Sequence, residues 1–452
     1  MSESVCPLEF RYGFPEMKKI FGEGAKLGYM LLVEGALALA QAKVGTIPPE
    51  AARAIDSVAR SDKVKLERVK QIEAETKHDI MALVKSLSEQ CGENGRFVHL
   101  GATSNDIIDT ASALQLKEAQ ELLRKDIVSM RDTLLAQALK HKNTVMLGRT
   151  HGQWAIPTTL GLKFAIFVAE FQRHLQRLDE VEKRICVGKI SGAVGTGAGY
   201  GPKALEIQDL VMESIGLHAP DATNQIIQRD RYAEFIFVLA NIAASVEKLA
   251  TEIRLLQRSE VGELSEPFDE KKQVGSSTMA QKRNPIVCEN SCGLARVVRG
   301  YVTPALENVS LWHERDLTNS SSERIILPHA CILTDYILQN MTKVVKGIRV
   351  NRDAMQANLE ETGGSIMAES VMLALTEKGM GRQEAHEVLR KSAIDARNKD
   401  RPLHEVLRAD KKVRKLLPGT ELDKALDYSS YIGVAVETVE RLARKIKPSG
   451  GK

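Results

Sequence analysis

The stretch Phe235-Ile-Phe-Val-Leu-Ala-Asn-Ile-Ala-Ala-Ser-Val-Glu-Lys-Leu-Ala-Thr-Glu-Ile-Arg-Leu-Leu256 decides the fold. Its apolar residues recur at alternating steps of four and three, which is the heptad spacing of a long helix in a bundle. They are Phe235, Leu239, Ile242, Val246, Leu249, Ile253 and Leu256. A second long helix is predicted from about Asp109 to His141, with a stripe that includes Leu116, Leu123 and Met130. Aromatic residues make up only 4% of the chain and β-branched alternation is scarce, so we predict an all-α protein.

The length of 452 residues exceeds what one simple core holds, so two or three domains are expected. Shorter helical patterns broken by turns such as Gly45–Pro49 precede the long helices, and Gly363-Gly364 interrupts the pattern after them. We therefore predict three helical domains: an N-terminal one at residues 1–108, a central long-helix bundle at 109–348, and a C-terminal one at 349–452.

Charge and hydropathy argue against several classes of partner. Lys and Arg exceed Asp and Glu by only four, and the excess lies in residues 401–452, where a solvated helix face explains it without nucleic acid. The N-terminus carries Glu3, Glu9 and Arg11 without an apolar core segment, and the uncharged runs are shorter than a bilayer needs. We expect neither secretion nor membrane insertion.

The cysteines and glycines suggest no cofactor. The six cysteines lack CxxC spacing, so we expect reduced core thiols in a cytoplasmic protein. Cys288 and Cys292 are neighbours on one helix face, but two thiols alone are a poor basis for a zinc site, and no metal ligand set is visible. The Gly-rich segment Ser191–Gly201 fits neither nucleotide-loop pattern, and we interpret it as a close-packed turn between bundle helices.

A second stretch, Val274-Gly-Ser-Ser-Thr-Met-Ala-Gln-Lys-Arg-Asn-Pro285, fits neither a buried strand nor an amphipathic helix. Gly275 supplies a hinge, Ser276 and Ser277 offer a nucleophile or base, and Lys282 begins a cationic run before Pro285, which is suited to open a helix. We interpret the stretch as a mobile functional loop. On composition alone, an ordinary polar turn is an equal alternative.

Four polar clusters accompany this loop, and each also has a plain structural reading as a helix cap, a turn or a salt-bridged helix end. In one, Thr103 and Ser104 at a predicted helix start are suited to cradle a carboxylate. In another, His151 on a turn is a candidate acid or base near neutral pH. Arg315 and Arg324 suit phosphate or carboxylate recognition. The clusters are Thr76–Asp79, His99–Asp106, Gly148–Gln153 and His313–Arg324.

The loop Gly275–Pro285 resembles the signature loop of the fumarase/aspartase superfamily, lyases that release fumarate, and the four clusters follow in the order of that superfamily's shared segments. Within it the chain is most similar to the branch whose substrate is adenylosuccinate, and the resemblance covers nearly the whole chain. The stretches that carry it include Arg11-Tyr12, Thr76–Asp79, Val98–Ser104, Gln225–Arg231 and Trp312–Asp316. Alternatives are an argininosuccinate lyase, a carboxymuconate cycloisomerase and a catalytically silent relative.

The resemblance implies a role for each matching residue. Ser276, with Ser277 as the neighbouring candidate, takes the proton from the succinyl Cβ, and His151 protonates the leaving nitrogen. His78 assists by positioning the substrate, while Lys282 and Asn284 hold the carboxylate on which charge develops. The implied substrate-binding residues are Arg11 and Tyr12 at the nucleotide end, Arg315, Ser320 and Arg324 on the phosphate side, Thr103, Ser104 and Gln225 at the succinyl group or purine, and also Lys77, Asp79 and His99.

The resemblance also implies a homotetramer whose central helices form one bundle, with each active site shared by three subunits and without a metal or cofactor. The sequence departs from the family pattern at Ala280, which stands in place of a proline, and at Trp154, Ile156, Tyr232 and Asn290. The first two of those four are expected to alter the support of His151, and Asn290 to weaken a substrate contact.

Overall fold

The computed structural model describes residues 4–269, 275, 278–279 and 281–446. The chain divides into two compact units, each made of interleaved segments. Unit 1 comprises residues 1–127, 173–246 and 293–339, and unit 2 comprises residues 128–172, 247–292 and 340–452. The division into three domains by sequence range stays a prediction.

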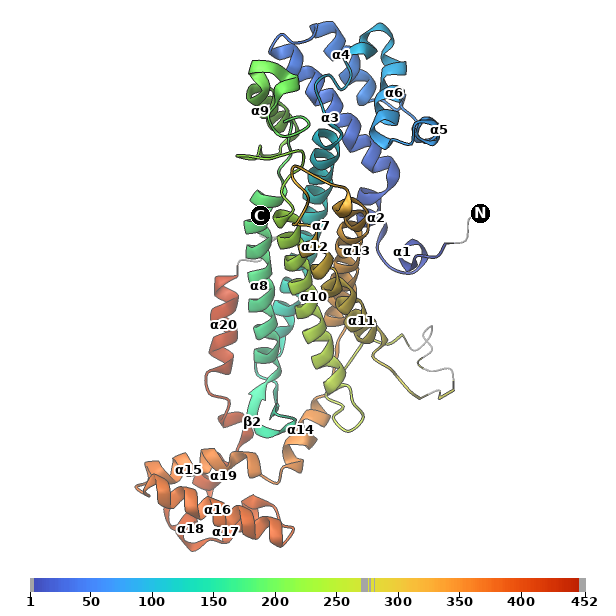
Figure 1. Ribbon diagram of the computed structural model, residues 1–452. Coiled ribbons are helices and arrows are strands. Elements are labelled where there is room, and N and C mark those ends of the chain that lie inside the picture. Colours follow the sequence, from blue (N-terminus) through green and yellow to red (C-terminus); the bar gives the residue numbers. More distant parts are fainter. Residues whose placement is uncertain (1–3, 270–274, 276–277, 280, 447–452) are drawn as a thin grey trace. The chain divides into compact units, whose positions relative to one another are not determined.

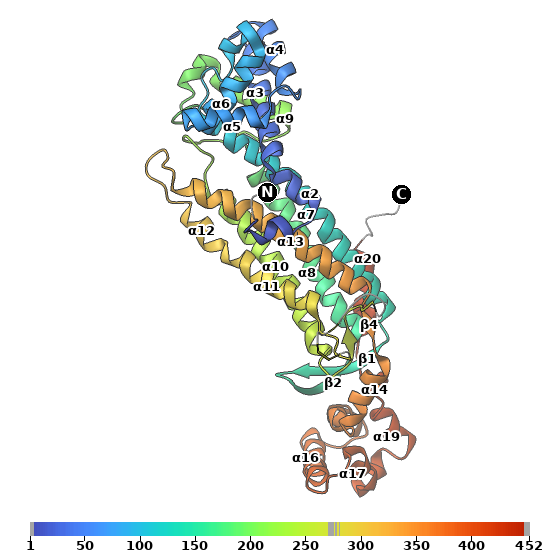
Figure 2. The ribbon, with the colours of Figure 1, turned by 90° about the vertical axis from the view of Figure 1, so that its right-hand side faces the viewer.

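Five helices have residues in both units and can be followed in Figures 1 and 2. They are α7 (Ser104–Lys140), α8 (Leu160–Ile185), α10 (Asp230–Leu256), α11 (Ile286–Gly300) and α13 (Thr318–Lys346). Every residue of the heptad stripe that predicted α10 is buried. The all-α prediction is confirmed, and α7 begins five residues earlier than the apolar pattern indicated because its first turn is polar.

Polar contacts fix the direction of these helices. In unit 1, the Gln120 side chain of α7 donates to the Leu178 carbonyl of α8 at 2.8 Å, and His174 of α8 contacts Ser245 of α10 at 2.8 Å. In unit 2, Lys163 of α8 pairs with Glu252 of α10 at 2.7 Å. In unit 1, Arg184 of α8 also pairs with Glu234 of α10 at 2.5 Å. Together with the His174–Ser245 contact, this pair shows that α8 and α10 run antiparallel there.

Elsewhere in unit 1, the helices between residues 23 and 91 pack around a core that includes Leu31, Ile55 and Leu83. Helices α3 and α4 pack closely, since a Cβ at Gly35 would lie only 3.3 Å from the Asp56 Cα atom. The other elements of unit 1 are α1 (Pro7–Phe10), α2 (Pro15–Phe21), α3 (Glu23–Lys43), α4 (Pro49–Ala59), α5 (Leu66–Thr76), α6 (Asp79–Cys91), η1 (Gly92–Phe97), η2 (Ala198–Lys203), α9 (Ala204–Ile215) and α12 (Val302–Glu307).

Unit 2 ends in a second cluster of short helices, around a core that includes Val371, Leu389 and Leu407. Its elements after the long helices are α14 (Arg352–Glu361), η3 (Ser365–Met367), α15 (Ala368–Glu377), α16 (Arg382–Asn398), α17 (Leu403–Ala409), α18 (Lys411–Leu416), α19 (Thr420–Ala425), η4 (Tyr428–Ser430) and α20 (Ala435–Lys445). Lys142 pairs with Glu440 of α20 at 2.5 Å, which ties this helix to the segment after α7.

Unit 2 also holds two small antiparallel strand pairs that the periodicity did not predict. Strand β1 (Val145–Thr150) pairs with β2 (Gln153–Thr159), and β3 (Leu264–Ser265) pairs with β4 (Arg349–Val350). The loop of the first hairpin is His151-Gly152, whose φ angles of 54° and 73° are both positive. That backbone matches the right-handed strand twist and defines a tight two-residue hairpin.

Three further predictions have outcomes in the fold. Five cysteines are buried and unpaired as predicted, but Cys6 is only half-buried and is not a core thiol. The Gly-rich segment is a close-packed turn as predicted, since a Cβ at Gly195 would lie 2.1 Å from the Thr223 carbonyl oxygen. None of the helices that the structure describes is both long and apolar enough to cross a bilayer.

Candidate active site

The predicted site residues fall into two groups, one in each unit. Unit 1 holds the residues predicted at the nucleotide end, together with the Thr76–Asp79 and His99–Ser104 clusters and Gln225. Unit 2 holds His151, Lys282 and Asn284. The predicted base Ser276, its neighbour Ser277 and the departure Ala280 lie outside the described residues.

A pocket in unit 1 collects the predicted phosphate-side residues. It has a volume of about 260 Å³ and is lined by Arg315, Ser320 and Arg324, together with Asn105, Lys26 and Arg229. Its walls come from α3, the first turns of α7 and α13, and the segments before α10 and α13. Arg315, Ser320 and Arg324 therefore share one concave surface with Lys26 and Asn105, which lie far earlier in the chain. Concave surfaces of this kind bind small molecules.

Arg315 is the best-placed cation in this pocket. It donates to the Gln225 Oε1 atom at 3.1 Å, so these two predicted residues are brought together. The Asn105 amide, oriented to satisfy its neighbours, accepts from the Arg315 Nε and Nη1 atoms at 3.2 and 3.1 Å. Burial lowers the pKa of Arg315. Its fixed guanidinium is held by neutral oxygens, which leaves its charge for an anionic ligand.

The Thr76–Asp79 cluster forms the junction between α5 and α6. Lys77 ends α5 in the left-handed conformation with φ of 56°, and the His78 Nδ1 atom accepts from the Met81 N–H at 3.3 Å. This is the capping role that the sequence offered as the plain reading. Asp79 lies 3.4 Å from Arg324, so the junction is joined to the phosphate-side residues.

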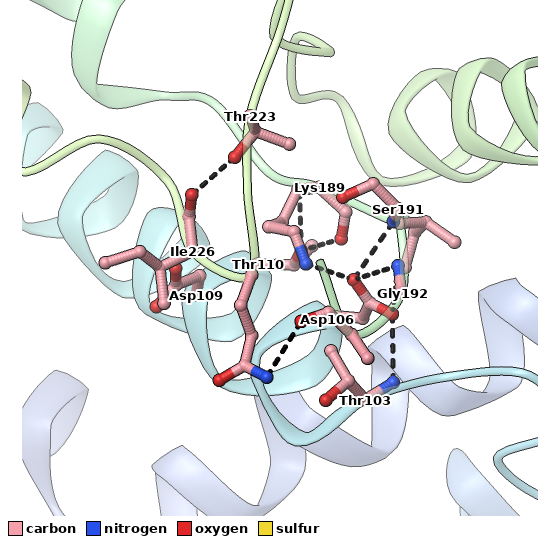
Figure 3. Close-up of polar contacts among 12 residues, drawn as sticks. Thr103, Asp106, Asp109, Thr110, Lys189, Ser191, Gly192, Thr223 and Ile226 are labelled. Carbon is pink, nitrogen blue, oxygen red and sulfur yellow. Dashed lines mark hydrogen bonds and ion pairs between the residues drawn. The ribbon is translucent and has the colours of Figure 1, made fainter. Parts of the chain in front are cut away.

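A buried carboxylate organises the turn that carries Thr103 and Ser104 (Figure 3). Asp106 is fully buried, pairs with the fully buried Lys189, and accepts from the backbone N–H groups of Thr103, Ser191 and Gly192 at 3.0 to 3.2 Å. The Tyr200 hydroxyl donates to it at 2.8 Å, and burial with this carboxylate raises the pKa of Tyr200 well above its ordinary value. The network joins the predicted succinyl-binding turn to the Gly-rich segment, a role that sequence reasoning missed.

His99 is anchored by a residue that no motif indicated. Its Nδ1 atom lies 2.6 Å from a carboxylate oxygen of the buried Glu34 on α3, and its backbone is left-handed with φ of 61°. Burial alone would lower the pKa of His99, but the hydrogen bond and charge of Glu34 outweigh burial and raise it. The imidazolium is therefore favoured beside the Thr103 turn.

In unit 2, His151 is exposed at the tip of the β1–β2 hairpin. The hairpin is fixed below it by Arg149, which pairs with both carboxylate oxygens of Glu263 at 2.9 and 3.0 Å. Glu263 is fully buried and also accepts from Asn358 at 2.7 Å. The imidazole thus projects from a braced strand pair, while the departures Trp154 and Ile156 lie half-exposed on β2.

Lys282 and Asn284 line an open cavity of about 700 Å³ together with Arg254 and Arg258. Asn284 donates to the Gly275 carbonyl oxygen at 3.2 Å, and a Cβ on Gly275 would lie 2.0 Å from the Lys282 carbonyl oxygen. Glycine is required there for close backbone approach, which the sequence interpretation as a hinge did not include.

The start of α11 after Pro285 is capped from a distance. The buried Glu266 carboxylate accepts from the N–H groups of Val287 and Cys288 at 3.2 and 2.6 Å. Among the described residues no group of three or more His, Cys, Asp or Glu side chains is arranged to hold a metal.

The all-α fold and the comparisons with known proteins identify the chain as a lyase of the fumarase/aspartase superfamily. Residues 9–300 match the sequence model of a family described as lyase, and residues 364–442 match that of the adenylosuccinate lyase C-terminus. A solved fumarate lyase from a Mesorhizobium species has a TM-score of 0.88 and 33% identity, covering 95% of this chain and 97% of that one. A 3-carboxy-cis,cis-muconate lactonizing enzyme from Pseudomonas putida has the same TM-score and 35% identity, covering 96% and 97%.

Curated relatives resolve the branch. Adenylosuccinate lyase of Pyrococcus abyssi is 54% identical over 98% of each chain, and that of Bacillus subtilis is 42% identical over 96% of this chain and 99% of its own. The chain belongs to the adenylosuccinate lyase family and is a carbon–nitrogen lyase.

Proposed function

We propose that this lyase carries out its reaction at a site that several copies of the chain build together. The reaction of the family is the β-elimination of fumarate from adenylosuccinate, which gives AMP, and from the succinylo-carboxamide ribotide of purine biosynthesis. The observation that carries the assignment is identity near 50% to adenylosuccinate lyases over almost the whole chain. Argininosuccinate and muconate substrates are not favoured.

The acid and base follow from the residues that match the family pattern. Ser276, or its neighbour Ser277, removes the proton from the succinyl Cβ atom, and His151 donates a proton to the leaving nitrogen. A serine side chain acts as a base only when its hydroxyl has lost a proton, which requires nearby cations to lower the pKa of the hydroxyl. Lys282 and Arg283 are the cations proposed for this role. Each proton transfer contributes roughly 10²–10⁴-fold to the rate.

The carboxylate beside the reacting carbon gains a second negative charge when the proton leaves. Lys282 and Asn284 stabilise this charge, and donors of this kind usually supply the largest contribution to such a rate. Their shared cavity, which Arg254 and Arg258 also line, supports this role because its positive charge favours a dianion.

The substrate is held at its other end by Arg11, Tyr12, Arg315, Ser320 and Arg324, with Gln225 and the Thr103-Ser104 turn at the succinyl group or purine. The contact of Arg315 with Gln225 supports this arrangement, since it joins the phosphate side to the succinyl side. His78, whose Nδ1 atom caps α6, retains Nε2 for positioning the substrate. Lys77, Asp79 and His99 complete the proposed binding set.

We propose a homotetramer with each site shared by three subunits, in the cytoplasm. Phe237 of α10 and Val297 of α11 are exposed by 56% and 44%, which is unusual for bundle helices unless further helices cover them. The exposed His151 supports a site completed by a neighbouring copy. The unpaired thiols suit a reducing compartment.

Two experiments test the proposal. The purified protein is offered adenylosuccinate and argininosuccinate separately, and fumarate release from adenylosuccinate alone is expected. Ser276→Ala and His151→Ala proteins, each inactive, are then dissociated, mixed and reassembled. Mixed tetramers, verified by mass, regain activity if the site is shared, whereas each variant reassembled with itself does not. No regain in verified mixed tetramers would overturn the shared site.

A further inference from the structure

Lys26 lies in the phosphate-side pocket although no motif indicated it. It belongs to α3, whose Leu27 and Leu31 are buried in the core of the unit, so the helix that carries it is fixed. Its side chain lines the same pocket as Arg315, Ser320 and Arg324. A fourth cationic side chain, that of Arg229, lies in the same wall.

The charges of these cations are unequally balanced. Arg229 pairs with the buried Asp109 at 2.8 Å and with Glu323 at 2.7 Å, so its charge is fully compensated inside the protein. Arg315 is held by the neutral amides of Gln225 and Asn105. Two of the four pocket cations are thus accounted for, one by carboxylates and the other by neutral acceptors.

The remaining two have weak or no partners. Arg324 meets Asp79 at 3.4 Å in an exposed pair, which contributes little in water. The Lys26 ammonium has no hydrogen bond or ion pair to any residue that the structure describes, and the nearby carboxylates of Asp79, Glu73 and Glu23 only partly offset the effect of burial on its pKa. Burial, with the charge of Arg324, lowers the pKa of Lys26.

A pocket with this balance favours a ligand that carries about two negative charges. Lys26 is partly buried, and a partly buried ammonium without a partner costs free energy, which a charged acceptor recovers on binding. A phosphate monoester carries about −1.5 to −2 at neutral pH and has three strong acceptor oxygens. The pocket lies where the proposed function puts the nucleotide phosphate.

We propose that Lys26 is a further substrate-binding residue, which holds the phosphate dianion of the nucleotide together with Arg315, Ser320 and Arg324. This inference rests on the proposed function, because that function supplies the phosphate. Lys26 selects for phosphorylated substrates and takes no part in the proton transfers. The helix that carries Lys26 is already fixed in the free protein, so little conformational entropy is lost when the phosphate binds.

The test uses Lys26→Met, the charge-preserving Lys26→Arg, and Lys43→Met as a matched control at the exposed end of the same helix. Inhibition of fumarate release is measured with inorganic phosphate, AMP and adenosine. Lys26→Met is expected to raise the inhibition constants of phosphate and AMP, and KM, by roughly ten- to hundred-fold, as loss of a charged hydrogen bond does. The inhibition constant of adenosine and kcat are expected to stay within about threefold of those of the unaltered protein. Lys26→Arg is expected to recover most of the lost affinity for phosphate and AMP.

A measurement on the unaltered protein guards against a variant that does not fold. Lys26 is acylated with a lysine-reactive reagent and the modified peptide is quantified by mass spectrometry. Phosphate and AMP are expected to protect it, while adenosine is not. Equal effects of the substitution on AMP and adenosine, or no protection by phosphate, would overturn the role of Lys26. Absence of fumarate release by the unaltered protein would instead overturn the proposed function, and the phosphate protection could still be read.

Discussion

Replacement of Asp106 by Asn probes the most connected polar group of the site. The change keeps the shape of the side chain but removes the charge that faces the fully buried Lys189. It also places an amide N–H₂ where the carboxylate accepts from Ser191, Gly192 and the Tyr200 hydroxyl. An uncompensated ammonium and at least one unpaired donor are left in the interior.

The magnitude follows from that burial. Breaking a buried ion pair on one side costs about 3–5 kcal/mol, whereas removing both charges together can be nearly neutral. Asp106→Asn is therefore expected to lower the local free energy of opening by that amount. Lys189→Met combined with Asp106→Asn is expected to recover most of the loss, since the stranded charge is gone.

Hydrogen exchange measures this effect locally. The N–H groups of Ser191 and Gly192, which donate to Asp106, are expected to exchange about 10²–10³-fold or more faster in the single variant, because each 1.4 kcal/mol is tenfold. Protein concentration is kept fixed, since assembly alters apparent stability. A change below about threefold, or a double variant less protected than the single one, would refute the reasoning about the stranded charge.

Two further predictions concern the other anchored segments. Glu34→Gln is expected to lower the pKa of His99 in a proton NMR titration, because the raised pKa depends on this carboxylate. Because folding raises the pKa of His99, protonated His99 stabilises the folded protein fully below its unfolded pKa of about 6.5. This stabilisation is lost as the pH rises through the folded pKa. The melting midpoint of Glu34→Gln is therefore expected to depend less on pH. Gly275→Ala is expected to lower kcat at least about tenfold, since its Cβ would collide with the Lys282 carbonyl oxygen at 2.0 Å, while Gly293→Ala, with no atom within 4 Å, serves as the control. Unchanged turnover in Gly275→Ala would show that this close approach is not needed.

Local patterns predicted the helices well. The α10 stripe repeats over six successive steps, so each apolar residue reinforces the same assignment, and all of it is buried. The β1–β2 hairpin was not predicted, because its strands are short and its turn is His151-Gly152, where a histidine takes a conformation that usually favours Asn or Gly. Cys6 was wrongly predicted to be a core thiol, since composition does not tell a surface thiol from a buried one.

Only part of the candidate site could be named from the sequence, because sequence patterns identify residues in contiguous motifs and miss isolated ones. Residues inside contiguous motifs, such as Arg315 and His151, could be named because their neighbours in sequence resemble a known pattern. Glu34 and Lys26 lie in the helix α3, and nothing in their immediate sequence marks them. Their roles arise from contacts with residues distant in the chain, as in the 65-residue separation between Glu34 and His99.

The sequence by itself determined that the chain is helical, that its long helices form a bundle and that it carries a lyase signature loop, because these features are written in short repeating or contiguous stretches. Only the tertiary structure decided that Asp106 and Lys189, 83 residues apart, share one buried network, and that Lys26 faces the arginines of the phosphate-side pocket. The physical reason is that a buried charge needs a partner in space, and its position along the chain is free so long as the packed helices bring the two together.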